Sequence, residues 1–210
     1  KLIAVAIGAC VLIGAGTGRA AMILTTGQTV TGTTKDIVLT AGSISPNTAA
    51  VTLSNSGSDL VVSFKSDSPN GDFYMQWDGA GDGLNFNTVG YDYLQIDIAS
   101  VSAGMVTSGW QLYWQDDDST IGGATNSGQT VGNVTPQAGA FSVVIDLTEG
   151  GTKVSGALGW GDGTTVNTLD KFRIDPFQSI ANAGESFTIS RIFFGTELTP
   201  TPEPASLALV

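Results

Sequence analysis

Apolar and polar residues alternate with a period of two along much of the chain, and turn-forming residues separate the alternating runs. This pattern predicts β-strands joined by loops. The stretches "SNSGSD", "DSPNGD" and "DGAGDG" are dense in turn residues, and no long stretch holds a helical period. We therefore predict an all-β protein with strands at Asp36–Thr40, Ala49–Ser54, Leu60–Phe64, Phe73–Trp77, Tyr91–Ile98, Trp110–Gln115, Phe141–Leu147, Leu169–Ile174 and Ser186–Phe194.

The period of two also divides the side chains of each predicted strand between two faces. One face is apolar: Leu94, Ile96 and Ile98; Trp110, Leu112 and Trp114; Phe141, Val143, Ile145 and Leu147; Phe172 and Ile174. The opposite face mixes polar and aromatic residues: Tyr93, Gln95 and Asp97; Gln111, Tyr113 and Gln115; Val144 and Asp146; Arg173 and Asp175. Packed together, the apolar faces form the interior of a two-sheet antiparallel sandwich about 10 Å thick.

Composition and charge narrow the classes of function. The 210 residues suit one domain of ordinary size. The net charge of −11 repels phosphate backbones, so we expect no nucleic-acid partner. The chain has no histidine, which removes the side chain best suited to proton transfer near neutral pH. Carboxylate chemistry and oxygen-ligated calcium remain open.

The N-terminal segment resembles a secretory signal. "KLIAVAIGACVLIGAG" is apolar behind one lysine, and "GTGRAA" then supplies small residues. We predict a signal peptide at residues 1–20 with cleavage after Ala20; cleavage after Ala21, acylation of Cys10 in a lipoprotein box and an uncleaved anchor are the alternatives. Residues 21–35 are predicted to be a linker or an edge strand, and residues 36–196 the sandwich domain.

The C-terminal segment "TPTPEPASLALV" carries a second targeting pattern. Residues 197–204 are rich in threonine and proline and predict a stiff linker. Pro202, Glu203 and Pro204, followed by an apolar run, resemble the PEP-CTERM sorting signal of Gram-negative bacteria. The resemblance implies an exosortase partner, release at the cell surface or into the extracellular matrix, and the start of a truncated membrane anchor at residues 205–210. The alternative is an ordinary proline-rich tail.

The body of the chain resembles a second family. "YDYLQIDI", "GWQLYWQ", "FSVVIDL", "FRIDPF" and "FTISRIFFG" occur in the order of strands in the galactose-binding-like jelly rolls that serve as carbohydrate-binding modules. This resemblance covers about half of the chain. It implies a jelly-roll fold and a glycan ligand, here an extracellular polysaccharide, but it does not name the sugar.

Glycan recognition combines aromatic faces with planar polar groups that make paired hydrogen bonds. We predict that one sheet face carries Tyr113, Gln111, Gln115, Asp97, Arg173 and Asp175, and that Trp77 and Trp160 form its rim. The alternatives are that Arg173 and Asp175 form only an ion pair, and that Trp160 covers the core edge. Trp110 and Trp114 are predicted to be core residues.

Two acidic runs raise the question of a cation. "DGAGDG" holds Asp78 and Asp82, and "DDD" holds Asp116 and Asp118. Neither has the spacing of a dedicated calcium loop. We expect solvated acidic turns here and no cofactor, with a structural calcium ion as the alternative.

The pattern therefore favours an exported, non-catalytic carbohydrate-binding protein. A structural surface or biofilm-matrix protein without a discrete ligand is the first alternative. A polysaccharide-active enzyme is the second, with Asp97, Asp146 and Asp175 as its conceivable carboxylates.

Overall fold

The computed structural model describes residues 23–25, 27–48, 50–65, 73–105, 108–115, 127–137, 139–147, 152–153, 168–177 and 184–200. Within these, side chains are described except at 23–25, 80, 108, 115, 127–132 and 152–153. The predicted signal peptide with its cleavage at Ala20, the Pro202–Pro204 motif and the 205–210 segment lie outside the described residues.

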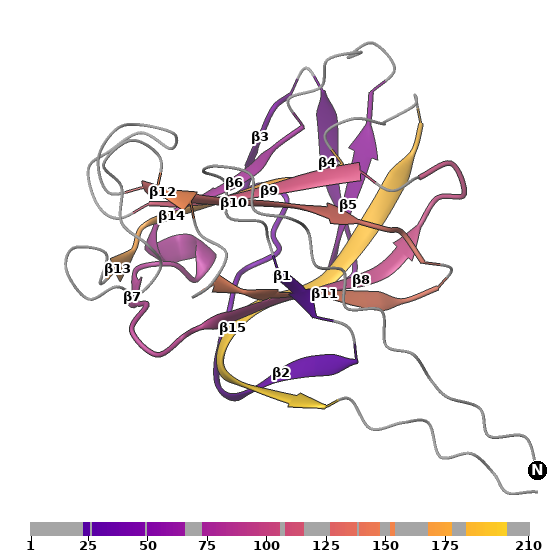
Figure 1. Ribbon diagram of the computed structural model, residues 1–210. Helices are drawn as coiled ribbons and strands as arrows, with labels where there is room; N and C mark the ends of the chain where they lie inside the picture. The colour runs from indigo at the N-terminus through magenta and orange to yellow at the C-terminus, as the bar shows by residue number, and fades with distance from the viewer. Residues whose placement is uncertain are drawn as a thin grey trace, which may run out of the picture.

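Two antiparallel sheets face each other, as Figure 1 shows. The seven-stranded sheet has the order β1-β11-β8-β15-β5-β4, with β2 also paired to β15. The six-stranded sheet has the order β12-β10-β9-β14-β6-β3, and β13 pairs with β7 in a small third sheet. The strands are β1 Ile23–Thr25, β2 Gln28–Asp36, β3 Ser45–Pro46, β4 Val51–Ser56, β5 Asp59–Phe64, β6 Met75–Asp78, β7 Phe86–Asn87, β8 Tyr93–Val101, β9 Ser108–Gln115, β10 Ser127–Val134, β11 Phe141–Asp146, β12 Thr152–Lys153, β13 Thr168–Leu169, β14 Lys171–Asp175 and β15 Ser186–Pro200, with a short 3₁₀ helix η1 at Ala80–Asp82.

The strand order is that of a jelly roll. Taken along the chain, β5, β6, β8, β9, β10, β11, β14 and β15 distribute as β11-β8-β15-β5 in one sheet and β10-β9-β14-β6 in the other. This interleaving is the double Greek key that defines the jelly roll. The predicted fold class, an all-β antiparallel sandwich of jelly-roll type, is confirmed.

The core lies between the two sheets, and the predicted inward rows form it. Leu94, Ile96 and Ile98 are buried, as are Trp110, Leu112 and Trp114. Aromatic side chains from the two sheets pack against each other: the centroid of the Trp110 ring lies 5.1 Å from that of Phe177 and 6.2 Å from that of Phe187. Truncating a buried aromatic side chain of this kind to alanine costs about 3–5 kcal/mol.

The observed strands differ from the predicted ones in several places. Asp36 ends β2, and residues 37–40 are irregular, with the Ile37 N–H donating to the Ile192 carbonyl. β10 was not predicted as a strand, because its sequence is rich in serine, glycine and asparagine. β15 continues to Pro200, so residues 197–200 are strand and not a polyproline-like linker.

β2 and the end of β15 form a two-stranded ribbon that crosses the outer face of the seven-stranded sheet (Figure 1). Its register shifts between Gly195 and Glu197, where Gly32 adopts φ +76°. A glycine with positive φ is typical of such a β-bulge, which bends the strand. A Cβ at Gly195 would lie 2.3 Å from Val30 Cγ1, so the close approach also requires glycine there.

A second, small apolar cluster holds this ribbon in place. It consists of Val30, Val144 and Phe193, against which Tyr93 and Leu198 pack. Val144 lies on the outer face of its strand, as predicted, but the ribbon covers it. The strand β2 is therefore an edge strand, as one of the two sequence alternatives for residues 21–35 proposed.

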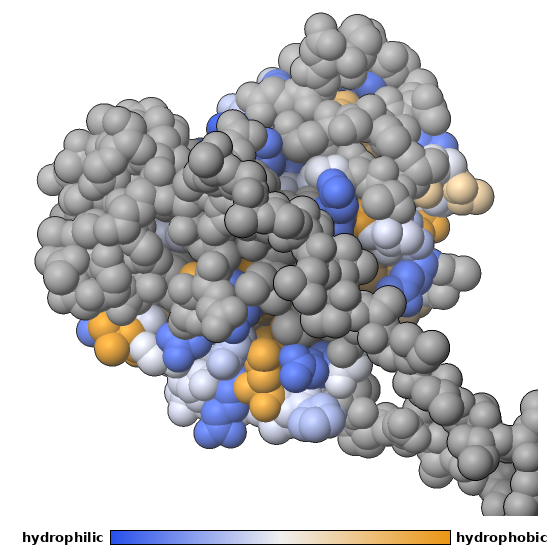
Figure 2. All heavy atoms as spheres, viewed as in Figure 1, coloured by the Kyte–Doolittle hydropathy of each residue, from blue (hydrophilic) through white to orange (hydrophobic). Residues whose placement is uncertain are grey.

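The described surface is mainly polar. Figure 2 shows hydrophilic residues with only isolated hydrophobic ones among the described part of this view. The exposed large hydrophobic residues in the described part of the chain are Val38 and Val89, at 38% and 55% exposure. Among the described residues, no helix is long and apolar enough to cross a membrane.

Candidate functional site

The outer face of the six-stranded sheet brings polar and aromatic side chains into one row. In the strand register, Arg173 of β14 is paired with Gln76 of β6 on one side and with Tyr113 of β9 on the other. Their strand neighbours Phe172, Trp77 and Trp114 point into the core. Because side chains alternate along each strand, the row that includes Arg173 must face outward.

Arg173 is the centre of this face. Its Nε lies 2.5 Å from Asp175 Oδ1, and its Nη2 lies 2.5 Å from Asp175 Oδ2. Its guanidinium carbon lies 4.1 Å from the ring centroid of Tyr74 and 5.1 Å from that of Tyr113. The side chains of Arg173 and Asp175 are 18% and 1% exposed. The guanidinium is thus held by the buried Asp175 carboxylate through charge-assisted hydrogen bonds and contacts two tyrosine rings through cation–π interactions.

Further polar groups extend the surface on both sides of Arg173. The Tyr113 hydroxyl donates to Gln111 Oε1 at 2.6 Å on β9. On β6, Gln76 Nε2 donates to both carboxylate oxygens of Asp78, at 2.8 and 3.0 Å. Each of these hydrogen bonds joins two residues that are two positions apart on one strand and therefore point to the same face of the sheet. We name the set Tyr74, Gln76, Gln111, Tyr113 and Arg173 the tyrosine–arginine face.

The structure brings together four of the predicted ligand residues. Gln111, Tyr113, Arg173 and Asp175 are neighbours on β9 and β14, and Asp175 forms an ion pair with Arg173. The structure shows the ion pair between Arg173 and Asp175, and a ligand role for the two residues stays a prediction. Gln115 continues β9 by backbone pairing with Lys171, and its side chain lies outside the described residues, as does Trp160.

Two predicted ligand residues lie elsewhere. Asp97 belongs to β8 of the seven-stranded sheet, so the prediction that it shares a face with Tyr113 is wrong. Trp77 is fully buried and its Nε1 donates to the Val38 carbonyl at 2.8 Å. The prediction that Trp77 forms a rim is therefore wrong, because the alternation in β6 turns it into the core.

Tyr74 and Gln76 were missed by the sequence analysis. The signal was present in "FYMQW", where Phe73, Met75 and Trp77 occupy one face and Tyr74 and Gln76 the other. The assignment of Trp77 to a surface role hid this division. Applied consistently, the period of two places Tyr74 outward.

The acidic turn after β6 uses its carboxylates for hydrogen bonds. Asp82 is buried, and its Oδ2 accepts from the Asp78 N–H at 3.1 Å. In the part of the chain that the structure describes, no three metal-ligating side chains gather in one place. Asp78 and Asp82 alone do not provide the six to eight oxygens that calcium prefers. Asp116 and Asp118 lie outside the described residues, so neither the expected solvated turn nor the alternative of a calcium ion is tested there.

A strained turn follows Asp175. Phe177 has φ +50° and is fully buried against Trp110 and Phe187. A bulky residue adopts this conformation only where its surroundings enforce it. The buried ring therefore fixes the end of β14, which carries the Arg173–Asp175 pair.

Comparison with known proteins gives structural likenesses only. No protein-family model matches the chain, and no curated protein matches it. A family 29 carbohydrate-binding module variant has 10% identity, covers 79% of this chain and 93% of that chain, and gives a TM-score of 0.41. Another such variant, complexed with mannohexaose, has 11% identity over 80% and 94% of the two chains, with a TM-score of 0.42.

The protein named PfGH50B has 15% identity, covers 81% of this chain and 24% of its own, and gives a TM-score of 0.49. At these identities each likeness concerns the fold, and none assigns a ligand to this chain.

Proposed function

We propose that this protein binds carbohydrate without cleaving it, through the tyrosine–arginine face. The observation that carries the proposal is the Arg173 guanidinium, which is held between the rings of Tyr74 and Tyr113 and locked onto the buried Asp175. Such a group is preorganised, so binding a ligand costs little side-chain entropy.

The chemistry of the face suits a sugar chain. Tyrosine rings offer apolar faces to the C–H patches of pyranose rings, while amide and guanidinium groups make paired hydrogen bonds to hydroxyls. Asp175, two residues along the same strand, compensates the charge of Arg173. The net charge of −11 disfavours anionic polymers at long range. We therefore propose a neutral polysaccharide as the ligand class.

The positions of the candidate catalytic carboxylates support a non-catalytic role. Glycoside hydrolysis requires two carboxyl groups on either side of the scissile bond. Asp175 lies on the six-stranded sheet, whereas Asp97 and Asp146 lie on β8 and β11 of the other sheet. Asp175 is also buried and bonded through both oxygens to Arg173.

The proposal includes export and surface sorting. The signal-like segment at 1–20 and the Pro202-Glu203-Pro204 motif support it. The chain would be exported by the first segment and processed at the second by an exosortase, with a transient C-terminal membrane anchor. Mass spectrometry of the mature protein from the native cell tests this: termini near Ala20 and Glu203 are expected, and intact ends would overturn it.

Binding is tested with the chain on a broad glycan array. Wild type is expected to bind neutral polysaccharides, and Tyr113→Ala and Tyr74→Ala are each expected to weaken binding by roughly tenfold, since they remove a ring face. Tyr93→Ala is the matched control, because it removes a half-buried tyrosine from β8 of the other sheet. A wild-type protein that binds no glycan would favour the structural matrix role instead.

A further inference from the structure

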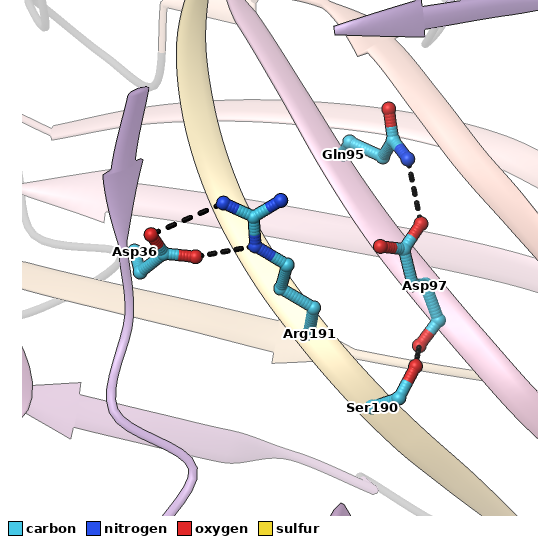
Figure 3. Close-up of polar contacts among 5 residues, drawn as sticks. All are labelled: Asp36, Gln95, Asp97, Ser190 and Arg191. Atoms are coloured by element: carbon cyan, nitrogen blue, oxygen red, sulfur yellow. Dashed lines mark hydrogen bonds and ion pairs between the residues drawn. The ribbon is translucent and has the colours of Figure 1, made fainter. Parts of the chain in front are cut away.

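A second arginine lies on the other sheet of the sandwich, and Figure 3 shows its contacts. Arg191 of β15 places Nε 2.5 Å from Asp36 Oδ1 and Nη2 3.2 Å from Asp36 Oδ2. Its guanidinium carbon lies 3.8 Å from the ring centroid of the buried Phe193. Arg191 and Asp36 are 45% and 56% exposed, so this arginine is fixed and yet open to solvent.

An irregularity in β15 presents Arg191 on this face. The pairing with β8 shifts between Ile189 and Arg191, so that Ser190 is an extra residue and Arg191 lies opposite Asp97. Ser190 Oγ donates to the Asp97 carbonyl at 3.3 Å. Bulges of this kind re-aim side chains and are frequent beside functional sites.

Asp97 is fixed as firmly as Arg191. Its Oδ1 accepts from Gln95 Nε2 and from Ser142 Oγ, each at 2.6 Å. Gln95 is itself buried, with its Oε1 accepting from the Val30 N–H at 2.8 Å. The network runs from the ribbon through Gln95 to Asp97 and leaves Asp97 Oδ2 outside these bonds.

Arg191 and Asp97 lie opposite each other on β15 and β8. The pKa of Arg191 is raised, first by its hydrogen bond to Asp36 and further by the charges of Asp36 and Asp97, against the opposing effect of partial burial. Among the described contacts, no hydrogen bond or ion pair joins Arg191 to Asp97. In Figure 3 the second terminal nitrogen of Arg191 and one oxygen of Asp97 point toward the space between them.

We propose that the gap between Arg191 and Asp97 is a second saccharide site, which takes a neutral vicinal diol. One sugar hydroxyl accepts from the guanidinium of Arg191, and the neighbouring hydroxyl donates to Asp97 Oδ2. A sugar diol suits this pair because each hydroxyl both donates and accepts. Two carboxylates and one guanidinium leave the site with a net negative charge, which disfavours acidic sugars. The inference rests on the proposed function and adds a second site to it.

The consequence is a bivalent module. The tyrosine–arginine face and the Arg191–Asp97 gap lie on the outer faces of different sheets, so two glycan chains can bind at once. Such a protein crosslinks polysaccharide, and its avidity for a polymer exceeds its affinity for a single oligosaccharide.

The test is a titration of the ¹⁵N-labelled chain with mannohexaose, cellohexaose and xylohexaose, followed by amide chemical shifts. We expect one set of shifts in β9 and β14 and a second set at Asp97, Ser190 and Arg191. Shifts confined to β9 and β14 would overturn the second site and leave the proposed function intact. Shifts only at Asp97 and Arg191 would support the second site and overturn the first. No shift with any of the three would overturn both for neutral hexasaccharides.

Variants separate binding from structure. Asp97→Asn removes the charged acceptor but keeps the shape of the side chain. The affinity measured from the shifts at Asp97, Ser190 and Arg191 should fall roughly tenfold, while the affinity measured from the shifts in β9 and β14 is unchanged. Arg191→Lys should act in the same direction, because lysine lacks the planar fork. Asp36→Asn is the matched control: its carboxylate lies on the side of the Arg191 guanidinium opposite to Asp97, so glycan affinity at the second site should fall less. Melting temperatures identify any variant that fails to fold, and equal losses in Asp97→Asn and Asp36→Asn would show that the cluster is a structural ion pair only.

Discussion

On each outer face of the sandwich an arginine contacts an aspartate and an aromatic side chain, but the residues that form this arrangement come from different parts of the chain. On the six-stranded sheet, Arg173 and Asp175 lie two residues apart on one strand, and the pair is largely buried. On the seven-stranded sheet, Arg191 and Asp36 are 155 residues apart in the chain and both are exposed. The first arrangement needs only β14 to be correctly paired, whereas the second needs the β2–β15 ribbon. The comparison shows that one chemical motif can have a local or a long-range origin, with different energetic weights.

The largest effect is expected from breaking the buried pair. Asp175→Ala leaves the Arg173 guanidinium partly buried without its counter-charge, and the free energy of unfolding should fall by about 3–5 kcal/mol. Urea denaturation measures this. If Asp175→Ala and Asp36→Ala lowered the free energy of unfolding by the same amount, the two ion pairs would not differ in stability as we expect.

The next largest effect is expected from a substitution in the β2–β15 ribbon. Gly195→Ala places a Cβ 2.3 Å from Val30 Cγ1 and 2.9 Å from the Thr31 carbonyl oxygen. The ribbon must shift to relieve this, which should cost about 1–3 kcal/mol in thermal or urea unfolding. The control is Gly42→Ala, where the added Cβ meets no atom within 4 Å. If Gly195→Ala left the free energy of unfolding unchanged, the ribbon would be only loosely attached to the sheet.

A smaller effect is expected from removing one ring beside Arg173. Tyr74→Ala takes away a cation–π contact that contributes about 0.5–2 kcal/mol. We expect a modest fall in melting temperature together with weaker glycan binding on β9 and β14. Tyr74→Phe keeps the ring and should restore both; if it does not, the hydroxyl and not the ring face carries the effect.

The smallest effect is expected at the exposed pair. Asp36→Ala should lower the free energy of unfolding by less than about 1 kcal/mol, and salt should reduce the difference from wild type. The pKa of Arg191 is raised in the fold, so its contribution is complete at neutral pH and disappears only as the pH rises through that raised value. The difference between wild type and variant should therefore not change with pH near neutrality. If the difference in unfolding free energy between wild type and Asp36→Ala changed steeply at mildly alkaline pH, it would not come from the Arg191 charge.

The sequence predicted the inward rows well because burial on both sheets enforces strict alternation. Trp110, Leu112 and Trp114 are fully buried, and Tyr113 and Gln111 between them face outward. The same alternation could not assign Asp97, since a period of two separates inside from outside but does not distinguish the outer faces of two sheets. That distinction depends on the pairing of β8 with β11 and β15, which involves residues far apart in the chain.

Two strands with a weak sequence signal, β10 and β2, are held by different interactions. β10 pairs along its whole length with β9 through backbone hydrogen bonds, and its sequence "SGQTVGNV" offers few apolar side chains as a signal. β2, with the sequence "QTVTGTTKD", depends on the small cluster around Val30 and on its partner β15. Neither strand contributes a long apolar row, so hydrophobic periodicity does not detect them. Tyr74 was predictable, and only the interpretation of Trp77 obscured it.

The pairing of Gln28 with Pro200 sets how the domain bears load. A pull on the Pro200 end draws β15 along its own axis between its flanking strands β8, β5 and β2. The hydrogen bonds of this central strand then resist together in shear. A pull that separates Gln28 from Pro200 instead opens the ribbon one bond at a time from its free end. A force applied at the Pro200 end alone therefore loads the domain along its mechanically stronger direction.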